Sequence, residues 1–208
     1  LDVSGSMRQI DIPPSRLAAA KKAALSFIHR QKASNQIGIV AFAGIAQLVQ
    51  PPTTDPEELE TAIMLLNTGR GTAIGSAIEA ALEAIDEFSQ SPGVETGDTG
   101  TGARLPDTGE KAYAPDIIVL LTDGVYTTGT HPLLAAEGAV EKGVRIYTIG
   151  FGTAEGGFQE GDFFGRRGWR HGIDEETLRG IAEMTGGGDY TAGSADELEK
   201  GFDNLPTF

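Results

Sequence analysis

The sequence predicts an α/β fold: a doubly wound, mostly parallel sheet with helices on both faces and one short antiparallel edge strand. Two observations carry this prediction. Apolar runs of strand length recur along the chain, and segments with the apolar spacing of a helix separate them. Parallel neighbours need a helix-sized crossover, so this alternation favours a parallel sheet covered on both faces. Of the 208 residues, 39% are hydrophobic, which is enough for a core at this size.

The strands are expected at the apolar runs. Residues 36–42 (QIGIVAF) and 116–122 (DIIVLLT) are nearly continuously apolar, which is typical of strands buried on both faces. Residues 144–149 and 190–191 predict two further strands, and residues 46–49 predict the short antiparallel edge strand. In such a sheet, ligands bind at the carboxyl ends of the strands, near the point where the strand order reverses.

The helices are expected where apolar residues recur at three- and four-residue spacing. Ser15, Asp55 and Ser194 are suitable N-caps, and Gly143 is a suitable stop after a helix. The predicted helices are residues 15–28, 55–66, 73–88, 132–142, 174–185 and 194–204.

We expect a single domain over residues 1–208 with two long loops. Residues 89–114 are rich in Gly, Thr, Pro and Asp without apolar periodicity, and they predict a flexible insertion. This insertion joins a helix to the start of a strand, whereas the loop at residues 151–173 leaves the carboxyl end of a strand. The two loops should therefore lie at opposite ends of the sheet, with the second on the ligand-binding side.

Composition excludes several classes of function. The net charge is −14, and an acidic chain repels phosphate backbones, so nucleic acid is not an expected partner. The absence of cysteine excludes disulfides and thiolate metal sites. No apolar run approaches the ~20 residues that span a bilayer, so we expect no direct membrane contact from this segment.

Three short motifs carry oxygen ligands. Asp2, Ser4 and Ser6 alternate at the start of the chain, where alternate side chains of an extended stretch point the same way and Gly5 lets the chain curl. Thr72 lies at a helix start, and Asp123 lies at the carboxyl end of an apolar strand. Carboxylate and hydroxyl oxygens suit a hard cation such as Mg²⁺.

The order D-x-S-x-S, then G-T-A-I-G, then L-T-D-G resembles the metal-ion-dependent adhesion site of von Willebrand factor A-type domains and integrin inserted domains. Residues 144–150 (VRIYTIG) and the closing residues 195–198 (ADEL) are also similar to the bacterial, membrane-anchored branch of this family, which includes the Bat aerotolerance type. The resemblance covers the whole chain except the two long loops.

The resemblance implies a role for each motif residue. Ser4, Ser6 and Thr72 would be direct hydroxyl ligands of Mg²⁺, or of Mn²⁺ or Ca²⁺, while Asp2 and Asp123 would act largely through bound waters. Either Thr72 or Asp123 would contact the metal, depending on the conformational state. Neutral direct ligands leave the ion's charge unquenched, so it stays attractive to a carboxylate of another protein. The implied function is metal-dependent protein–protein recognition through a partner's Asp or Glu, without catalysis. In integrin relatives a shift of the last helix, here residues 194–204, couples to the state of the site.

Other functions remain open at this point. The same binding chemistry would serve a subunit that recruits a chaperone-like ATPase of the AAA+ type. A metal-assisted hydrolase would need a general base, for which Asp123 is the candidate. A Ser–His hydrolase would need one of the three histidines, His29, His131 or His171.

The loop at residues 151–173 gives a separate hypothesis. Its residues Arg166, Arg167, Trp169 and Arg170 would form a positive, partly aromatic rim on the metal face, and such residues often anchor interfaces. A loop with one tucked tryptophan is an equally good interpretation.

The beginning of the chain predicts a structural problem. In the family, a central strand precedes the aspartate of D-x-S-x-S, but here only Leu1 precedes Asp2. We expect the first central strand to be largely missing from this chain, which is then a fragment of a longer protein. The relatives imply a soluble domain anchored to a membrane by segments outside this chain, on a side that the sequence does not specify.

Overall fold

The computed structural model describes residues 1–90, 116–153 and 173–205. Nearly all of the predicted insertion and the rim residues Arg166, Arg167, Trp169 and Arg170 lie outside these ranges, as does His171. The hypotheses about those segments therefore stay predictions.

The strands of the described residues form two groups. In one, β1 (Ile37–Phe42) and β2 (Ala46–Thr53) pair antiparallel. In the other, β3 (Ile117–Thr122), β4 (Arg145–Phe151) and β5 (Asp189–Ala192) pair in parallel in that order. The predicted α/β fold with one antiparallel strand is confirmed. The antiparallel strand is longer than the four residues predicted, because a strand with only one neighbour tolerates prolines that donate no hydrogen bond.

The first three residues lie between the two groups. Leu1 donates from its amino group to the Val40 carbonyl at 2.8 Å, and the Asp2 N–H donates to the Leu121 carbonyl at 2.9 Å. Val3 continues the pairing by donating to the Phe42 carbonyl, so that Asp2 forms a parallel bridge with β1. These residues thus bridge β1 and β3 through their backbone hydrogen bonds.

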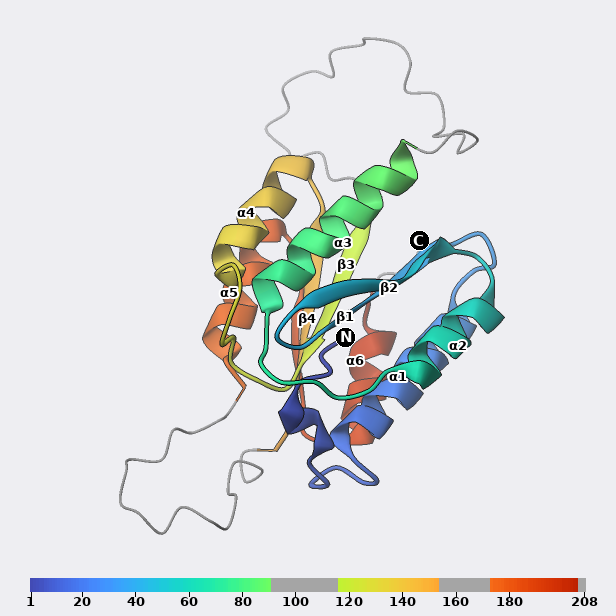
Figure 1. Ribbon diagram of the computed structural model, residues 1–208, viewed down its shortest axis with the longest axis vertical. Helices are drawn as coiled ribbons and strands as arrows, with labels where there is room; N and C mark the ends of the chain where they lie inside the picture. Colours follow the sequence, from blue (N-terminus) through green and yellow to red (C-terminus); the bar gives the residue numbers. More distant parts are fainter. Residues whose placement is uncertain (91–115, 154–172, 206–208) are drawn as a thin grey trace.

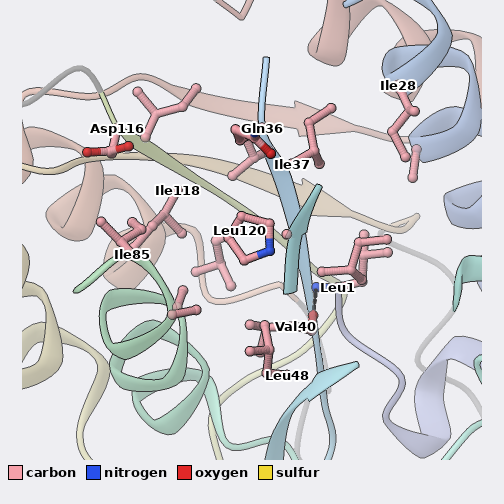
Figure 2. Close-up of a pocket in the computed structure, with 18 of the residues that line it drawn as sticks. Leu1, Ile28, Gln36, Ile37, Val40, Leu48, Ile85, Asp116, Ile118 and Leu120 are labelled. Atoms are coloured by element: carbon pink, nitrogen blue, oxygen red, sulfur yellow. Dashed lines mark hydrogen bonds between the residues drawn. The ribbon is translucent and has the colours of Figure 1, made fainter. Parts of the chain in front are cut away.

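Ahead of Leu1 the space between β1 and β3 is a cavity of about 480 Å³ (Figure 2). Its walls are mostly apolar side chains, among them Val40 of β1 and Ile118 and Leu120 of β3. The described residues supply no strand to fill it.

Helices cover both faces of the sheet (Figure 1). One layer consists of α1 (Arg16–Arg30), α2 (Pro56–Leu65) and α6 (Ala195–Asp203). The other layer consists of α3 (Ile74–Ser89), α4 (Pro132–Lys142) and α5 (Glu175–Thr185). The described part of the chain contains no helix of the length and hydrophobicity that a membrane crossing would need.

The core follows from the two-residue period of the strands. In β3, Ile118 and Leu120 pack under α3, α4 and α5, while Leu121 packs on the opposite side with α1 and α6. In β4, Ile146 and Ile149 likewise belong to opposite cores. Because both faces of these strands are buried, nearly every side chain is apolar, which is why their sequences read as continuous apolar runs.

The helix boundaries agree with the capping signals of the sequence. The side chains of Ser15, Asp55 and Ser194 each accept a backbone N–H of the first turn that follows. Gly143 ends α4 with φ +69°, a left-handed conformation that glycine adopts without a steric penalty.

The conformation after Ser4 differs from the prediction. Ser4 itself is extended, but residues Gly5–Arg8 form a short 3-10 helix, η1, so the stretch is not extended through Ser6. The turn allows Ser4 and Ser6 to face each other across Gly5, and it buries Met7 in the core between α1 and the sheet.

Candidate metal centre

The predicted site residues lie on three segments at one end of the sheet. The first segment continues the central strand into η1, the second enters α3, and the third leaves β3. Figure 1 shows η1, the beginning of α3 and the end of β3 at the same end of the molecule. This is the carboxyl end of the parallel strands, as the sequence predicted.

Asp2 is held from both sides by donors of the chain. Its Oδ1 accepts the Ser4 N–H at 2.7 Å, and its Oδ2 accepts the hydroxyl of Thr122 at 2.6 Å. The side chains of Asp2 and Thr122 are buried, and the main chain of Asp2 is fixed by its hydrogen bond to Leu121. The carboxylate therefore has one defined orientation.

Ser4, Ser6 and Asp123 form a compact cluster, although Asp123 is more than a hundred residues away from the two serines in the chain. The Ser4 and Ser6 hydroxyl oxygens lie 2.8 Å apart. Ser6 donates to Asp123 Oδ1 at 2.6 Å, and the Ser4 Oγ lies 3.5 Å from the same oxygen. Ser4 and Asp123 are buried, while Ser6 is partly exposed, so the cluster opens to solvent on the Ser6 side.

Thr72 is fixed by the loop that follows β3. Its N–H donates to the hydroxyl of Thr127 at 2.9 Å, and its carbonyl accepts the Thr127 N–H at 2.9 Å. A Cβ placed on Gly124 would lie 3.9 Å from both the Ser6 Oγ and the Thr72 Oγ1. The hydroxyls of Thr72 and Ser6 thus both lie near Gly124, which follows Asp123 directly, so the structure brings the three motifs to one place.

The two carboxylates share a buried environment with little solvent. Burial, followed by the negative charge of Asp123, raises the pKa of Asp2 above its ordinary value. Burial also raises the pKa of Asp123, against the opposing hydrogen bonds from Ser6 and Arg16. The site therefore holds negative charge that is incompletely compensated, which is a condition that a bound cation would relieve.

Arg16 is a neighbour of the site that the sequence analysis missed. It is only 3% exposed, and its Nη1 lies 2.9 Å from Asp123 Oδ2. Its Nε and Nη2 bind both oxygens of Asp11, at 2.9 and 2.6 Å. One signal was present in the sequence: Arg16 is the first residue of a helix, where the helix dipole disfavours a positive charge.

The donor set fits Mg²⁺ better than a softer metal. The candidate ligands are hydroxyl and carboxylate oxygens, and the described residues contain no group of three or more His, Cys, Asp or Glu side chains suited to hold a metal. A cation at this site would have to rely on the hydroxyls of Ser4, Ser6 and Thr72.

The histidines of the described residues do not support a Ser–His pair. His29 faces Glu60 at 3.1 Å on the outside of α1, and His131 caps α4 by accepting the Leu133 N–H. His131 also packs edge-on against Tyr126. Neither histidine has a hydrogen bond to Ser4 or Ser6 in the described structure.

Comparisons with known proteins give a consistent result. Residues 1–125 match a family model described as "von Willebrand factor type A domain". Among curated proteins, the chain is 35% identical to a UPF0353 protein of Nocardia farcinica and 34% identical to one of Mycolicibacterium gilvum, over 99% of this chain in both cases. It covers 60% and 57% of those proteins, so it spans less than two thirds of their length.

Solved structures resemble the fold over nearly all of the chain. An aerotolerance-related membrane protein of Bacteroides fragilis has a TM-score of 0.70 at 24% identity, covering 97% of this chain and 93% of that one. BatB of Bacteroides thetaiotaomicron has a TM-score of 0.66 at 24% identity, covering 98% and 96%. Proximal thread matrix protein 1 of the mussel byssus, described with a zinc-occupied MIDAS motif, has a TM-score of 0.63 at 22% identity, covering 98% and 44%.

Proposed function

Because the chain belongs to the von Willebrand factor type A domain family, we propose that it is a protein-interaction module that binds a partner's Asp or Glu through a divalent metal ion. The ion would be held by Ser4, Ser6 and Thr72 directly and by Asp2 and Asp123 through waters. Mg²⁺ is the best match to these oxygens, with Mn²⁺ and Ca²⁺ as the other candidates.

One observation carries the proposal. Both carboxylates are engaged by donors of the chain itself: Asp2 by Ser4 and Thr122, and Asp123 by Ser6 and Arg16. The hydroxyl oxygens keep lone pairs that these hydrogen bonds do not use. A metal ion bound mainly by neutral hydroxyls keeps most of its positive charge, which favours a carboxylate from another molecule as its next ligand.

The surface around the site supports a protein as the partner. Ile10 and Ile45 are each 76% exposed, and Val125 is also exposed. Ile10 follows η1, Ile45 lies at the β1–β2 turn beside the loop that carries Thr72, and Val125 follows Asp123. These three side chains lie on the segments that carry or adjoin the candidate ligands, where a bound protein would cover them. We propose that the partner presents its acidic residue next to apolar side chains.

The structure favours binding over catalysis by Asp123. A general base must draw a proton from water or substrate. The guanidinium of Arg16 lies on Oδ2 of Asp123, and its positive charge opposes the transfer of a proton to this carboxylate. We therefore propose no enzymatic activity for the site.

The relatives extend the proposal to the protein's surroundings. A structural neighbour is described as a membrane protein, and the curated relatives are longer than this chain. We propose that the domain is held at a membrane by segments outside residues 1–208. A partner of the AAA+ ATPase class is a second candidate, since it would use the same carboxylate chemistry.

The test is a calorimetric titration of Mg²⁺ and Mn²⁺ into the metal-free chain, with Ser4→Ala and Asp123→Ala alongside. We expect saturable binding at one site that both substitutions weaken. Absence of binding in the folded, unaltered chain would overturn the proposal. Given binding, capture of partners with and without a chelator, followed by identification of the captured proteins, separates an AAA+ ATPase from other ligands.

A further inference from the structure

The buried guanidinium of Arg16 is an unexpected feature of a site built for a cation. A positive charge close to a metal site opposes metal binding, and burying an arginine is costly unless it is paired. Arg16 is 3% exposed and lies between two carboxylates, Asp123 on the side of the candidate ligands and Asp11 on the other. Its placement needs a reason beyond packing.

The contacts of Arg16 are specific. The interaction with Asp11 is bidentate, with Nε to Oδ1 at 2.9 Å and Nη2 to Oδ2 at 2.6 Å, and the remaining Nη1 binds Asp123 Oδ2 at 2.9 Å. The guanidinium also lies against Gly152, where a Cβ would come within 3.1–3.2 Å of it. A side chain at position 152 would push the guanidinium away from this place.

Asp11 is fixed in turn by the end of the neighbouring strand. Its Oδ2 accepts the hydroxyl of Thr153 at 2.7 Å, and Thr153 lies two residues after the end of β4. The hydrogen bonds of Arg16 hold the pKa of Asp11 at about 2, so this carboxylate is ionised at neutral pH. Arg16 and Asp11 thus form a neutral pair beside the two carboxylates of the site.

We propose that Arg16 is an internal counter-charge that competes with the metal ion for Asp123, and that the Asp11–Arg16 pair thereby sets the metal affinity of the site. This inference rests on the proposed function. In the metal-free chain, Arg16 compensates the charge of Asp123 and holds its orientation. With a cation bound, Arg16 remains on Oδ2 and keeps Asp123 from becoming a close ligand, so Arg16 is a positioning residue for the site.

The proposal predicts opposite effects for the two members of the pair. Arg16→Gln removes the positive charge but keeps an N–H donor, so Mg²⁺ should bind about tenfold more tightly or better. Asp11→Asn leaves the charge of Arg16 less compensated, so Mg²⁺ should bind about tenfold more weakly. Arg16→Lys keeps the positive charge but loses the bidentate geometry with Asp11. If the charge sets the affinity, Mg²⁺ should bind to this variant within about threefold of the unaltered chain.

The test is calorimetric titration of Mg²⁺ into the 208-residue chain and these three variants, with circular dichroism and thermal melting to check folding. A purely structural role for Arg16 would weaken binding in both Arg16→Gln and Asp11→Asn, and that result would overturn the proposal. Equal affinities in all four proteins would overturn it as well. If Arg16→Gln does not fold, Asp11→Asn with Arg16→Lys decides the matter, because only the counter-charge predicts weaker binding in the first and near-normal binding in the second.

The failures of the two proposals are distinguishable. If the unaltered chain is folded and binds no Mg²⁺, the proposed function fails and the counter-charge fails with it. If the unaltered chain binds Mg²⁺ and Ser4→Ala weakens that binding, the proposed metal site stands. In that case the direction in which Mg²⁺ affinity changes in the Arg16 and Asp11 variants tests the counter-charge alone.

Discussion

Thr122 donates its hydroxyl to Asp2 Oδ2 at 2.6 Å, a hydrogen bond between residues 120 positions apart in the chain. Thr122 is the last residue of β3 and is fully buried, and Asp2 ends the central strand segment. The bond locks the first segment of the candidate site to the third. It also satisfies Oδ2 of a buried carboxylate whose Oδ1 accepts the Ser4 N–H.

Replacing Thr122 by valine tests this bond, because valine has nearly the same shape without the hydroxyl. A buried acceptor that loses its partner costs about 1–3 kcal/mol, so we expect Thr122→Val to lower the free energy of unfolding by that amount in denaturant titrations. Mg²⁺ affinity should fall as well, because Asp2 loses its fixed orientation. The matched control is Thr130→Val, whose hydroxyl donates to the exposed Glu79. Thr130→Val should change the free energy of unfolding by no more than about 0.5 kcal/mol. Equal losses of stability in both variants would contradict a special role for the Thr122–Asp2 hydrogen bond.

The pKa shifts of Asp2 and Asp123 predict how metal binding depends on pH. Both values are raised above 3.8 in the metal-free fold. At pH values between 3.8 and the raised pKa values, the native metal-free state therefore binds more protons than the unfolded state. Its stability should rise as the pH falls through this range. A metal ion needs the ionised carboxylates, so its affinity should fall over the same window.

The measurement is thermal melting across a pH series with Mg²⁺ or with a chelator. The stabilisation by Mg²⁺ should be large at neutral pH and should begin to fall on acidification before the pH reaches 3.8. Ser6→Ala, which removes a ligand without altering a carboxylate, should show little Mg²⁺ effect at any pH. A constant Mg²⁺ effect down to pH 4 in the unaltered chain would show that the two carboxylates do not support the ion.

Much of the fold is predictable from the sequence because its main strands and helices carry strong local signals. Strands such as β3 are buried on both faces, which forces continuous apolar runs, and helices such as α2 begin with a capping acid and a proline. The edge strand β2 is less predictable. Pro51 and Pro52 near its end resemble a loop, and only the pairing of the flanking Gln50 and Thr53 with β1 makes them part of a strand.

The candidate ligands were predictable as positions but not as an arrangement. Each of the three motifs stands at a strand end or a helix start, which local patterns reveal. The network that orients them is not local: Arg16 reaches Asp123 across 107 positions, and Thr153 reaches Asp11 across 142. No periodicity or spacing contains such pairs, so Arg16, Asp11 and Thr122 emerge only when the chain is folded.

Gly75 predicts a steric limit on the approach of two site segments. It lies in the first turn of α3, three residues after Thr72, and a Cβ there would collide with the carbonyl oxygen of Thr130. Gly75→Ala should therefore force apart α3 and the loop after Asp123. We expect a loss of about 1–3 kcal/mol in denaturant unfolding and weaker Mg²⁺ binding, because Thr72 moves with the helix.

A second helical glycine gives the control for that prediction. At Gly138 in α4, a Cβ would make an ordinary contact of 3.6 Å with the side chain of Leu82. Gly138→Ala should be neutral or should stabilise by up to about 1 kcal/mol through helix propensity. Similar losses at the two glycines would mean that the close approach at Gly75 does not limit the packing of the site.

The cavity between β1 and β3 predicts that residues placed ahead of Leu1 stabilise the domain. The amino group of Leu1 is buried and bonded to the Val40 carbonyl, and burial lowers its pKa from 8.0 to about 6. Between pH 6 and 8 the native state therefore binds fewer protons than the unfolded state, so the stability of the 208-residue chain should rise with pH by up to about 3 kcal/mol. An extension by several strand-forming apolar residues would replace the buried charge with a peptide N–H and fill the cavity of about 480 Å³.

The extended chain should accordingly melt at a higher temperature, and its stability should change little between pH 6 and 8. Thermal melts of the two proteins at several pH values check both expectations. An extension of the same length rich in Gly and Ser separates the two contributions, because it removes the terminal charge without supplying apolar side chains. The Gly- and Ser-rich extension should abolish the pH dependence of stability, but it should raise the melting temperature less than the apolar extension does. Identical melts of all three proteins would mean that the space between β1 and β3 does not accept a strand, and that Leu1–Val3 alone hold the two groups of strands together.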